Sequence, residues 1–344
     1  MNILSRVPLK AFTAKLKDLV KPGYTKAMWP TGGFFLIYIA LTALLVYVDL
    51  SFVSTLYMNL MMLMYGMAST SGILLALLEL LGVFALILAL GFWFNFISTA
   101  VVFTYQDRLQ HPDVVVGPST IWKNFKHLRK NQLWRISLYT GLFIFLWTLP
   151  LTIVGSFVSK YTWAVYTIRI LNYLIIIWKS YEYSQATLLY REKQPSFLGQ
   201  SMRHALTASR RFMGGLKFNF LLLQIVLVLL PIVVWSAIFG GVAYYGIYTA
   251  TYFFMYLGYA LIALGITAYL PVVYAIRALF YEEAKKHIKV DANFIGLFKP
   301  VEVLTGKPSN TVTNRWSKKS QLKRPKRARP KRQNNLGEWP PTTV

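Results

Sequence analysis

The chain has 344 residues, of which 56% are apolar and only 14% are charged, and its formal net charge is +25 at pH 7. Soluble proteins carry about 25% charged residues, so this composition excludes a soluble globular domain and favours a polytopic membrane protein. The chain contains no cysteine, which excludes disulfides, thiolate catalysis and cysteine-based metal sites.

Residues 1–28 form a basic amphipathic segment without the apolar core and cleavage site of a signal peptide, so we expect the first span to act as its own insertion signal. Within this segment, residues 8–21 have the spacing of a short helix, with Leu9, Phe12 and Leu16 on one face. We expect this helix to lie at the headgroup level with its apolar side toward lipid, or to be an ordinary flank of the first span.

Six apolar segments are long enough to cross a membrane. We place these spans at about residues 31–48, 73–105, 136–157, 163–190, 218–239 and 249–275 of a transmembrane domain covering residues 29–285. The stretch 50–72 is apolar but interrupted by serine and asparagine, and it holds no Lys or Arg. We interpret it as an outer connection, re-entrant or interfacial, because a seventh span there would place the following basic loops outside.

The basic residues are segregated along the chain. All but three of the 37 Lys and Arg fall into four stretches that the six spans place on one side, and the exceptions are Lys160, Arg169 and Lys179. Because positively charged loops stay on the cytoplasmic side, this pattern predicts that both termini are cytoplasmic.

Two cytoplasmic connections carry further signals. Residues 106–135 form a basic loop in which Trp122 and Trp134 are expected at the membrane interface. Residues 195–213 predict a second amphipathic interfacial helix, and Lys217 follows it as an anchor at the start of the fifth span. The spans contain no G-x-x-x-G motif, so we expect that close-packing device to be absent.

Residues 286–344 are predicted to form a basic, largely disordered cytoplasmic tail. Its candidate residues for binding anionic lipid or RNA are Lys318, Lys319, Lys323, Arg324, Lys326, Arg327, Arg329, Lys331 and Arg332. They can attract anionic headgroups at about 1 kcal/mol each, bind ribosomal RNA, or only reinforce the inside orientation. We favour the headgroups, since no aromatic residue suited to base stacking is interleaved among residues 318–332.

Several different short motifs lie between the third predicted span and the end of the sixth. Residues 179–185 read KSYEYSQ and fit a K-x-Y-x-Y-S pattern, and residues 143–150 read FIFLWTLP. The other motif residues are Tyr181, Tyr183, Ser184, Ser209, Arg210, Met213, Gly215, Pro271, Tyr274 and Arg277.

Together these motifs resemble a bacterial integral-membrane family known as domain of unknown function 975, whose members are uncharacterised six-span proteins common in Gram-positive bacteria. The resemblance covers about residues 91–286. The Pro-Gly turn that the family has before its K-x-Y motif is missing here, and the basic tail lies outside the resemblance. Because the family has no assigned biochemistry, the resemblance implies fold and topology and no mechanism.

Five polar residues within the spans are candidates for a transport path: Glu79, Arg169, Asn172, Lys179 and Glu182. A carboxylate inside a span is costly, so Glu79 predicts an ion or proton site, unless it lies near the outer interface. Arg169 either reaches water by extending its side chain or pairs with Glu79. Asn172, and Asn95 of the second span, are more typical of hydrogen bonds between helices.

Lys179 and Glu182 lie three residues apart on one helix, which predicts an ion pair at the inner end of the fourth span. The pair belongs either to a transport path or to a packing and anchoring cluster. The four histidines, His111, His127, His204 and His287, show no metal-ligand spacing, and the chain contains no nucleotide-binding or nucleophile motif. We therefore expect no metal, no cofactor and no enzymatic role, with a membrane enzyme as the remote alternative.

These observations predict an all-α polytopic protein of the bacterial cytoplasmic membrane, with about six spans and cytoplasmic interfacial helices. We expect a non-enzymatic accessory or scaffold protein whose cationic face binds the anionic headgroups of the lipid bilayer. A ribosome or another membrane protein is a possible partner, and the oligomeric state stays open. The alternative is a transporter, channel or insertase-like conduit lined by the polar residues between the spans.

Overall fold

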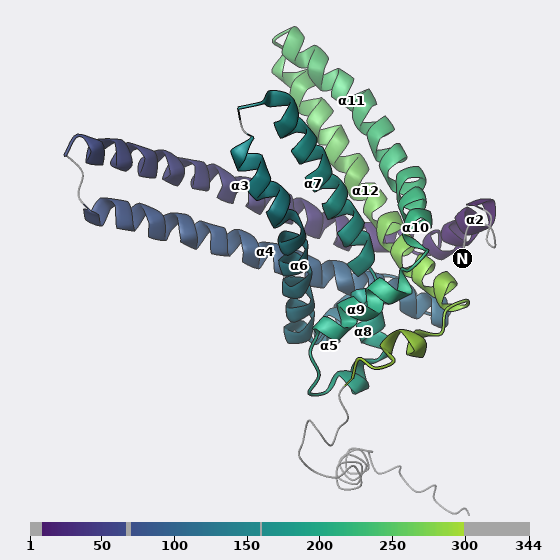
Figure 1. Cartoon of the computed structure of the whole chain (residues 1–344). Helices are drawn as coiled ribbons and strands as arrows, with labels where there is room; N and C mark the ends of the chain where they lie inside the picture. The colour runs from purple at the N-terminus through teal and green to yellow at the C-terminus, as the bar shows by residue number, and fades with distance from the viewer. Residues whose placement is uncertain (1–8, 67–69, 159, 299–344) are drawn as a thin grey trace, which may run out of the picture. The chain divides into compact units, whose positions relative to one another are not determined.

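A computed structural model describes residues 9–66, 70–158 and 160–298 (Figure 1). This part of the chain is helical and contains no strand. The α-helices are α2 (Leu9–Val20), α3 (Tyr24–Met64), α4 (Thr70–Gln110), α5 (Pro118–His127), α6 (Lys130–Phe157), α7 (Thr162–Tyr183), α8 (Ala186–Glu192), α9 (Arg203–Phe212), α10 (Lys217–Gln224), α11 (Leu230–Tyr248) and α12 (Tyr252–Lys285). Short 3₁₀ segments, η1 (Gln194–Phe197) and η3 (Val290–Phe294), and the π-helical η2 (Ile225–Leu229) complete it. Of the predicted tail 286–344, residues 299–344 with the candidate lipid-binding residues lie outside the described residues, whereas its first residues include η3, in which Val290 and Phe294 are buried.

Five helices in this part of the chain are long and apolar enough to cross a membrane. They are α3, α4, α6, the continuous segment from α10 to α11, and α12. The predicted all-helical class is therefore confirmed for the described residues, with five candidate membrane spans. The predicted fourth span, α7, is not among the five because Arg169, Lys179 and Glu182 interrupt its apolar sequence. A count of six spans, and the orientation of the termini, stay predictions.

Helices α3 and α4 form a long hairpin that extends away from the other helices (Figure 1). Each has 41 residues, or about 60 Å at 1.5 Å per residue. The expected break after residue 48 is wrong, because α3 continues through most of the predicted outer connection. Its hydroxyls bond within the helix, as Ser51 Oγ donates to the Val48 carbonyl at 2.6 Å and Thr55 Oγ1 donates to the Ser51 carbonyl at 3.0 Å. Polar side chains satisfied in this way do not end a helix.

The helices of the predicted fourth, fifth and sixth spans also end at other residues than expected. The fourth segment ends at Tyr183, and the predicted continuation to Tyr190 is instead the separate helix α8. The fifth segment reaches Tyr248, and the sixth continues to Lys285, beyond the expected ends of the two spans. The added residues of α12 are buried by protein, since Tyr281 and Ala284 are both 0% exposed, whereas the end of α11 is exposed, at 80% for Tyr248.

One end of the bundle carries a compact core, which we call the helical head. It comprises α2, α5, α8 and α9 together with the adjoining ends of α4 and α12 (Figure 1). Ala275, Leu279, Phe280 and Tyr281 at the end of α12 are each at most 1% exposed. The long helices instead expose many large apolar side chains, as expected for surfaces that face lipid.

The two predicted interfacial helices belong to this core. Phe12 of α2 is 1% exposed, and α2 packs on α12 and α4, so its apolar face contacts protein and the expectation that it faces lipid is wrong. The second helix begins at Arg203 rather than at residue 195, and Leu198 lies outside it and is exposed. Leu206 and Phe212 of α9 are buried in the head. An apolar helix face is satisfied equally by lipid and by a protein core, and here it meets the core.

Close packing through glycine occurs without the G-x-x-x-G motif. A Cβ at Gly258 of α12 would lie 2.6 Å from the Ala243 backbone nitrogen and 2.7 Å from the Phe239 carbonyl oxygen of α11. Helices that approach this closely gain dispersion contacts along their backbones. The G-x-x-x-G motif is absent from the spans, and glycine and alanine instead meet across this hairpin at another spacing.

We expect Gly258→Ala to lower the free energy of unfolding by about 1–3 kcal/mol, since the added methyl group meets backbone atoms that cannot move aside. Denaturant titration of the detergent-solubilised protein measures this change. Gly241→Ala is the matched control, because a Cβ at Gly241 meets nothing within 4 Å. Equal stabilities of the two variants would contradict the close approach of α11 and α12.

Candidate functional site

The site begins at the break between α7 and α8. Ser209 of α9 is fully buried, and its Oγ donates to the Glu182 carbonyl at 2.7 Å and accepts the Gln185 backbone N–H at 3.2 Å. Arg277 of α12 donates to the Ser184 carbonyl and, at 3.1 Å, to Thr187 Oγ1. The backbone groups freed by the break are thus satisfied by side chains from two other helices.

Directly before the break, one carboxylate holds two lysines. Lys179 Nζ lies 3.0 Å from Glu182 Oε2, and Lys217 Nζ pairs with Glu182 Oε1. The side chains of Glu182, Lys179 and Lys217 are only 4%, 10% and 15% exposed. The ion pair expected from the i, i+3 spacing therefore forms, and a second lysine from α10 joins it.

Two tryptophans complete this arrangement. Lys179 Nζ lies 4.0 Å from the ring centroid of Trp147, and Lys217 Nζ lies 4.4 Å from that of Trp178. We call these five residues the Glu182 cluster. A cation over an indole ring is stabilised when water is excluded, so each ring adds a favourable contact to its lysine. The formal charge of the cluster is +1.

A groove of about 500 Å³ lies against the cluster, between α6, α7 and α10. Its walls are mainly apolar and include Leu174, Trp178 and Leu221, while Lys179 and Lys217 supply its cationic groups. This volume is in the range of small-molecule sites. The arrangement suits a ligand with one anionic group and an apolar body.

The other predicted polar residues do not join this site. Glu79 of α4 is partly exposed and Arg169 of α7 is exposed, and neither forms an ion pair within the described residues. The Glu79–Arg169 pair is thus a wrong prediction. Asn172 is partly buried, and its Oδ1 has no hydrogen-bond partner in the described part of the chain. Asn95 does join two helices, since its Nδ2 donates to Ser137 Oγ of α6 at 2.7 Å.

Most of the motif residues serve packing around the break. Tyr181 meets Phe220 edge to face at 5.5 Å, and Tyr183 lies 6.3 Å from Phe143, both measured between ring centroids. Tyr274 OH and Ser98 Oγ share a hydrogen bond of 3.1 Å. Among the remaining motif residues, Met213 and Pro271 are buried and Arg210 is exposed. Gly215 has a φ of 75°, in the left-handed region that favours glycine.

The sequence alone does not indicate that Lys217 and the two tryptophans take part in this site. Lys217 lies 35 residues after Glu182, and we expected it only to anchor the fifth span. In the sequence, Lys217 is only a lysine directly before an apolar segment, and this position does not indicate which residue it pairs with. No group of three or more metal-ligating side chains is close enough to hold a metal ion in the part of the chain described.

Comparison of the chain with protein-family models, with curated proteins and with solved structures finds no match. The resemblance to the uncharacterised six-span family therefore stays a prediction.

We expect Glu182→Gln to lower the free energy of unfolding by about 3–5 kcal/mol, because it leaves two buried lysines without their carboxylate. Denaturant titration in detergent measures the effect. The control is Glu79→Gln, the same change at a residue without an ion pair in the described structure, which we expect not to lower stability. A Glu182→Gln variant as stable as the wild type would show that the lysines do not depend on this carboxylate.

Proposed function

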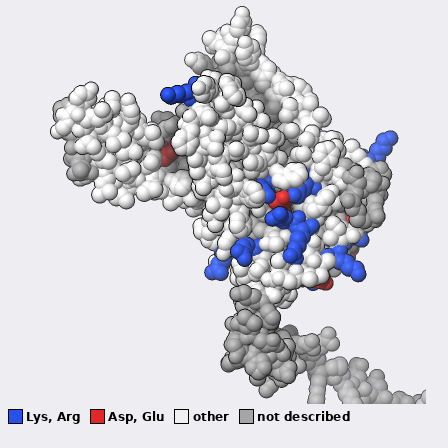
Figure 2. Space-filling model, viewed as in Figure 1, with Lys and Arg blue, Asp and Glu red and all other residues white. Residues whose placement is uncertain are grey.

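We propose that this protein is a non-enzymatic accessory or scaffold of the bacterial cytoplasmic membrane whose cationic cytoplasmic face binds anionic lipid. Five long apolar helices support residence in a membrane. Figure 2 supports the cationic face: on the side it displays, Lys and Arg gather mainly over the region of α8 and α9, while the long helices are largely free of them. The cytoplasmic location of this face follows from the positive-inside rule.

The observation that carries this proposal is the Glu182 cluster at the edge of an apolar groove. One carboxylate cannot neutralise two lysines, so the cluster retains a positive charge in a largely water-excluded position. An anionic headgroup near Lys179 and Lys217 would balance this charge through charge-assisted hydrogen bonds. An acyl chain of the same lipid would cover the apolar groove wall.

The cluster is rigid enough to act as a preformed site. Glu182 fixes both lysines, Trp147 and Trp178 limit their movement, and Ser209 fixes the backbone of Glu182 itself. A ligand that meets groups already held in place has less conformational entropy to remove on binding. We therefore attribute selective lipid binding to this groove, and a weaker, less specific attraction to the many exposed cations.

The alternative function, a conduit for a solute, needs polar residues that face a common path through the spans. Glu79 and Arg169 are separate from each other and from the Glu182 cluster, and no described cavity includes either of them. This separation favours a lipid-binding scaffold over the conduit. It equally favours a positioning role for Lys179 and Glu182 over a transport role.

We expect the wild-type protein to retain phosphatidylglycerol more tightly than phosphatidylcholine when it is released from mixed-lipid nanodiscs and measured by native mass spectrometry. Lys217→Met should weaken the tightest phosphatidylglycerol binding about tenfold, the effect of losing one hydrogen bond to a charged group. Lys217→Arg should retain most of it, because the positive charge stays at the groove.

Two controls separate the groove from general charge effects. Lys160→Met removes one exposed lysine remote from the groove and should leave the tight binding unchanged. Deletion of residues 315–333 removes most of the basic tail and should weaken flotation with anionic vesicles while leaving the tightly retained lipid in place. Equal retention of the two lipids by the wild type would contradict the proposal, as would equal losses in Lys217→Met and Lys160→Met.

A further inference from the structure

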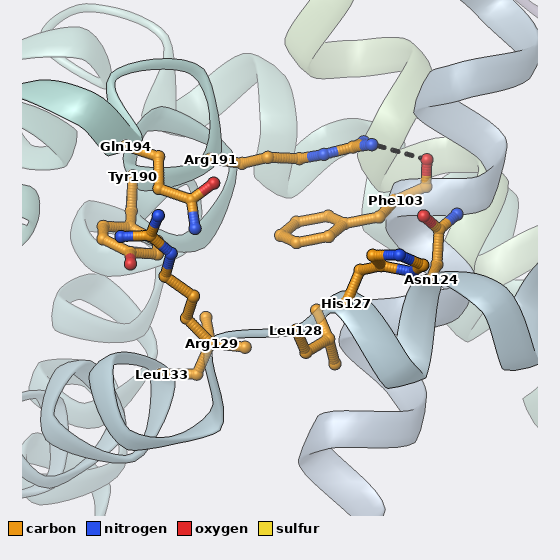
Figure 3. Close-up of a pocket in the computed structure, with 9 residues that line it drawn as sticks. All are labelled: Phe103, Asn124, His127, Leu128, Arg129, Leu133, Tyr190, Arg191 and Gln194. Atoms are coloured by element: carbon orange, nitrogen blue, oxygen red, sulfur yellow. Dashed lines mark hydrogen bonds between the residues drawn. The ribbon is translucent and has the colours of Figure 1, made fainter. Parts of the chain in front are cut away.

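A second, smaller cavity lies in the helical head, away from the Glu182 cluster. It has a volume of about 190 Å³ and lies between α4, the connection from α5 to α6, and α8 with the start of η1. Figure 3 shows Arg129, Tyr190 and Gln194 on one side of it, and Phe103, Asn124 and His127 on the other. Its size is roughly six times the 30 Å³ that one water occupies in the liquid, which suits a small polar group.

The cavity is positively charged. Arg129 and Arg191 line it, and none of the described residues lining it is acidic. The two arginines differ in how they are held. Arg191 is committed to protein groups, with Nη1 donating to the Phe103 carbonyl at 3.0 Å and to Gln106 Oε1 at 2.8 Å, and Nη2 pairing with Asp107 at 2.5 Å.

Arg129 is held differently, because the group that its guanidinium approaches is the Tyr190 hydroxyl and not a carboxylate. It forms no ion pair with any described residue, and Figure 3 shows its guanidinium directed toward Tyr190 and Gln194. A guanidinium presents several N–H donors in one plane and matches the oxygen atoms of a phosphate group. Arg129 is therefore placed to supply both charge and donors to a ligand in the cavity.

The hydroxyl of Tyr190 is the second group without a fixed partner. The residue is only 3% exposed, and its hydroxyl lies near Arg129 and Gln194 but makes no hydrogen bond of normal geometry with any described residue. Burial raises the pKa of this phenol, so the group keeps its proton and can donate. A buried hydroxyl without a partner is costly, and a ligand oxygen would relieve that cost.

We propose that this cavity binds a phosphate group, held by the Arg129 guanidinium, the Tyr190 hydroxyl and the Gln194 amide, with Arg191 as a fixed positive wall. The three donors come from two adjacent segments and converge on one side of the cavity. The phosphate belongs either to a small soluble phosphate compound or to a phosphomonoester lipid headgroup. This site shares no residue with the groove at the Glu182 cluster, so it does not rest on the lipid-binding proposal.

The test uses the full chain in a neutral detergent, titrated calorimetrically with inorganic phosphate at constant ionic strength set with chloride. We expect saturable binding that Arg129→Gln weakens about tenfold or more and Tyr190→Phe weakens about three- to tenfold, as for lost hydrogen bonds to a charged ligand. Arg135→Gln is the matched control: it removes an exposed arginine nearby in the sequence that does not line the cavity, and we expect no change.

A second arm distinguishes the two sources of phosphate. The same variants are reconstituted in nanodiscs containing phosphatidate or only phosphatidylcholine, and lipid binding is measured by native mass spectrometry. Phosphatidate binding that depends on Arg129 without binding of inorganic phosphate would assign the site to a lipid headgroup. The proposal is overturned if neither probe binds, or if Arg129→Gln and Arg135→Gln reduce binding equally. Unfolding curves of each variant without ligand show whether a loss reflects folding instead.

Discussion

The pairing of one buried carboxylate with two lysines at the α7 break is the interaction on which the site depends. Glu182 holds together Lys179 of its own helix and Lys217 of α10, and its carbonyl is held by Ser209 of α9. Removal of the carboxylate would leave two charges in a position that excludes water, which is far less favourable than replacement of all three by apolar groups. Such an arrangement fixes geometry more than it adds net stability, and a fixed geometry is what a binding site requires.

The same logic governs the helical head. Helix α2 reaches α12 through an ion pair of 3.0 Å between Lys15 and Glu283, and Lys286 contacts the same carboxylate oxygen at 2.7 Å. One acidic residue again serves two lysines. The chain has 12 acidic and 37 basic residues, so a buried carboxylate readily finds more than one lysine. In the head only the carboxylate of this group is buried: the Glu283 side chain is 5% exposed, whereas those of Lys15 and Lys286 are 47% and 58% exposed.

The sequence predicts the helices well and their partners poorly. Apolar length located the five helices that are long enough to cross a membrane, and the i, i+3 spacing located the Lys179–Glu182 pair. The sequence did not locate the end of α3. A serine such as Ser51 can end a helix or, as here, hydrogen-bond within it, and the sequence does not distinguish the two cases. Nor did it indicate that α2 packs on protein, since an apolar stripe is the same for lipid and for a core. Lys217 and Glu182 meet only through tertiary packing, which no local pattern encodes.

The groove and the smaller cavity would bind an anionic ligand through different interactions. In the groove, both lysines are already paired, so a ligand gains from the residual charge and from apolar contact along the walls. In the smaller cavity, Arg191 is paired with a carboxylate but Arg129 has no ion pair among the described residues, so a ligand gains chiefly from direct hydrogen bonds to the Arg129 guanidinium. Salt weakens the interactions of exposed charges more than those of buried ones. Binding at exposed Arg129 should therefore fall with ionic strength more steeply than binding in the groove, and that contrast follows from burial alone.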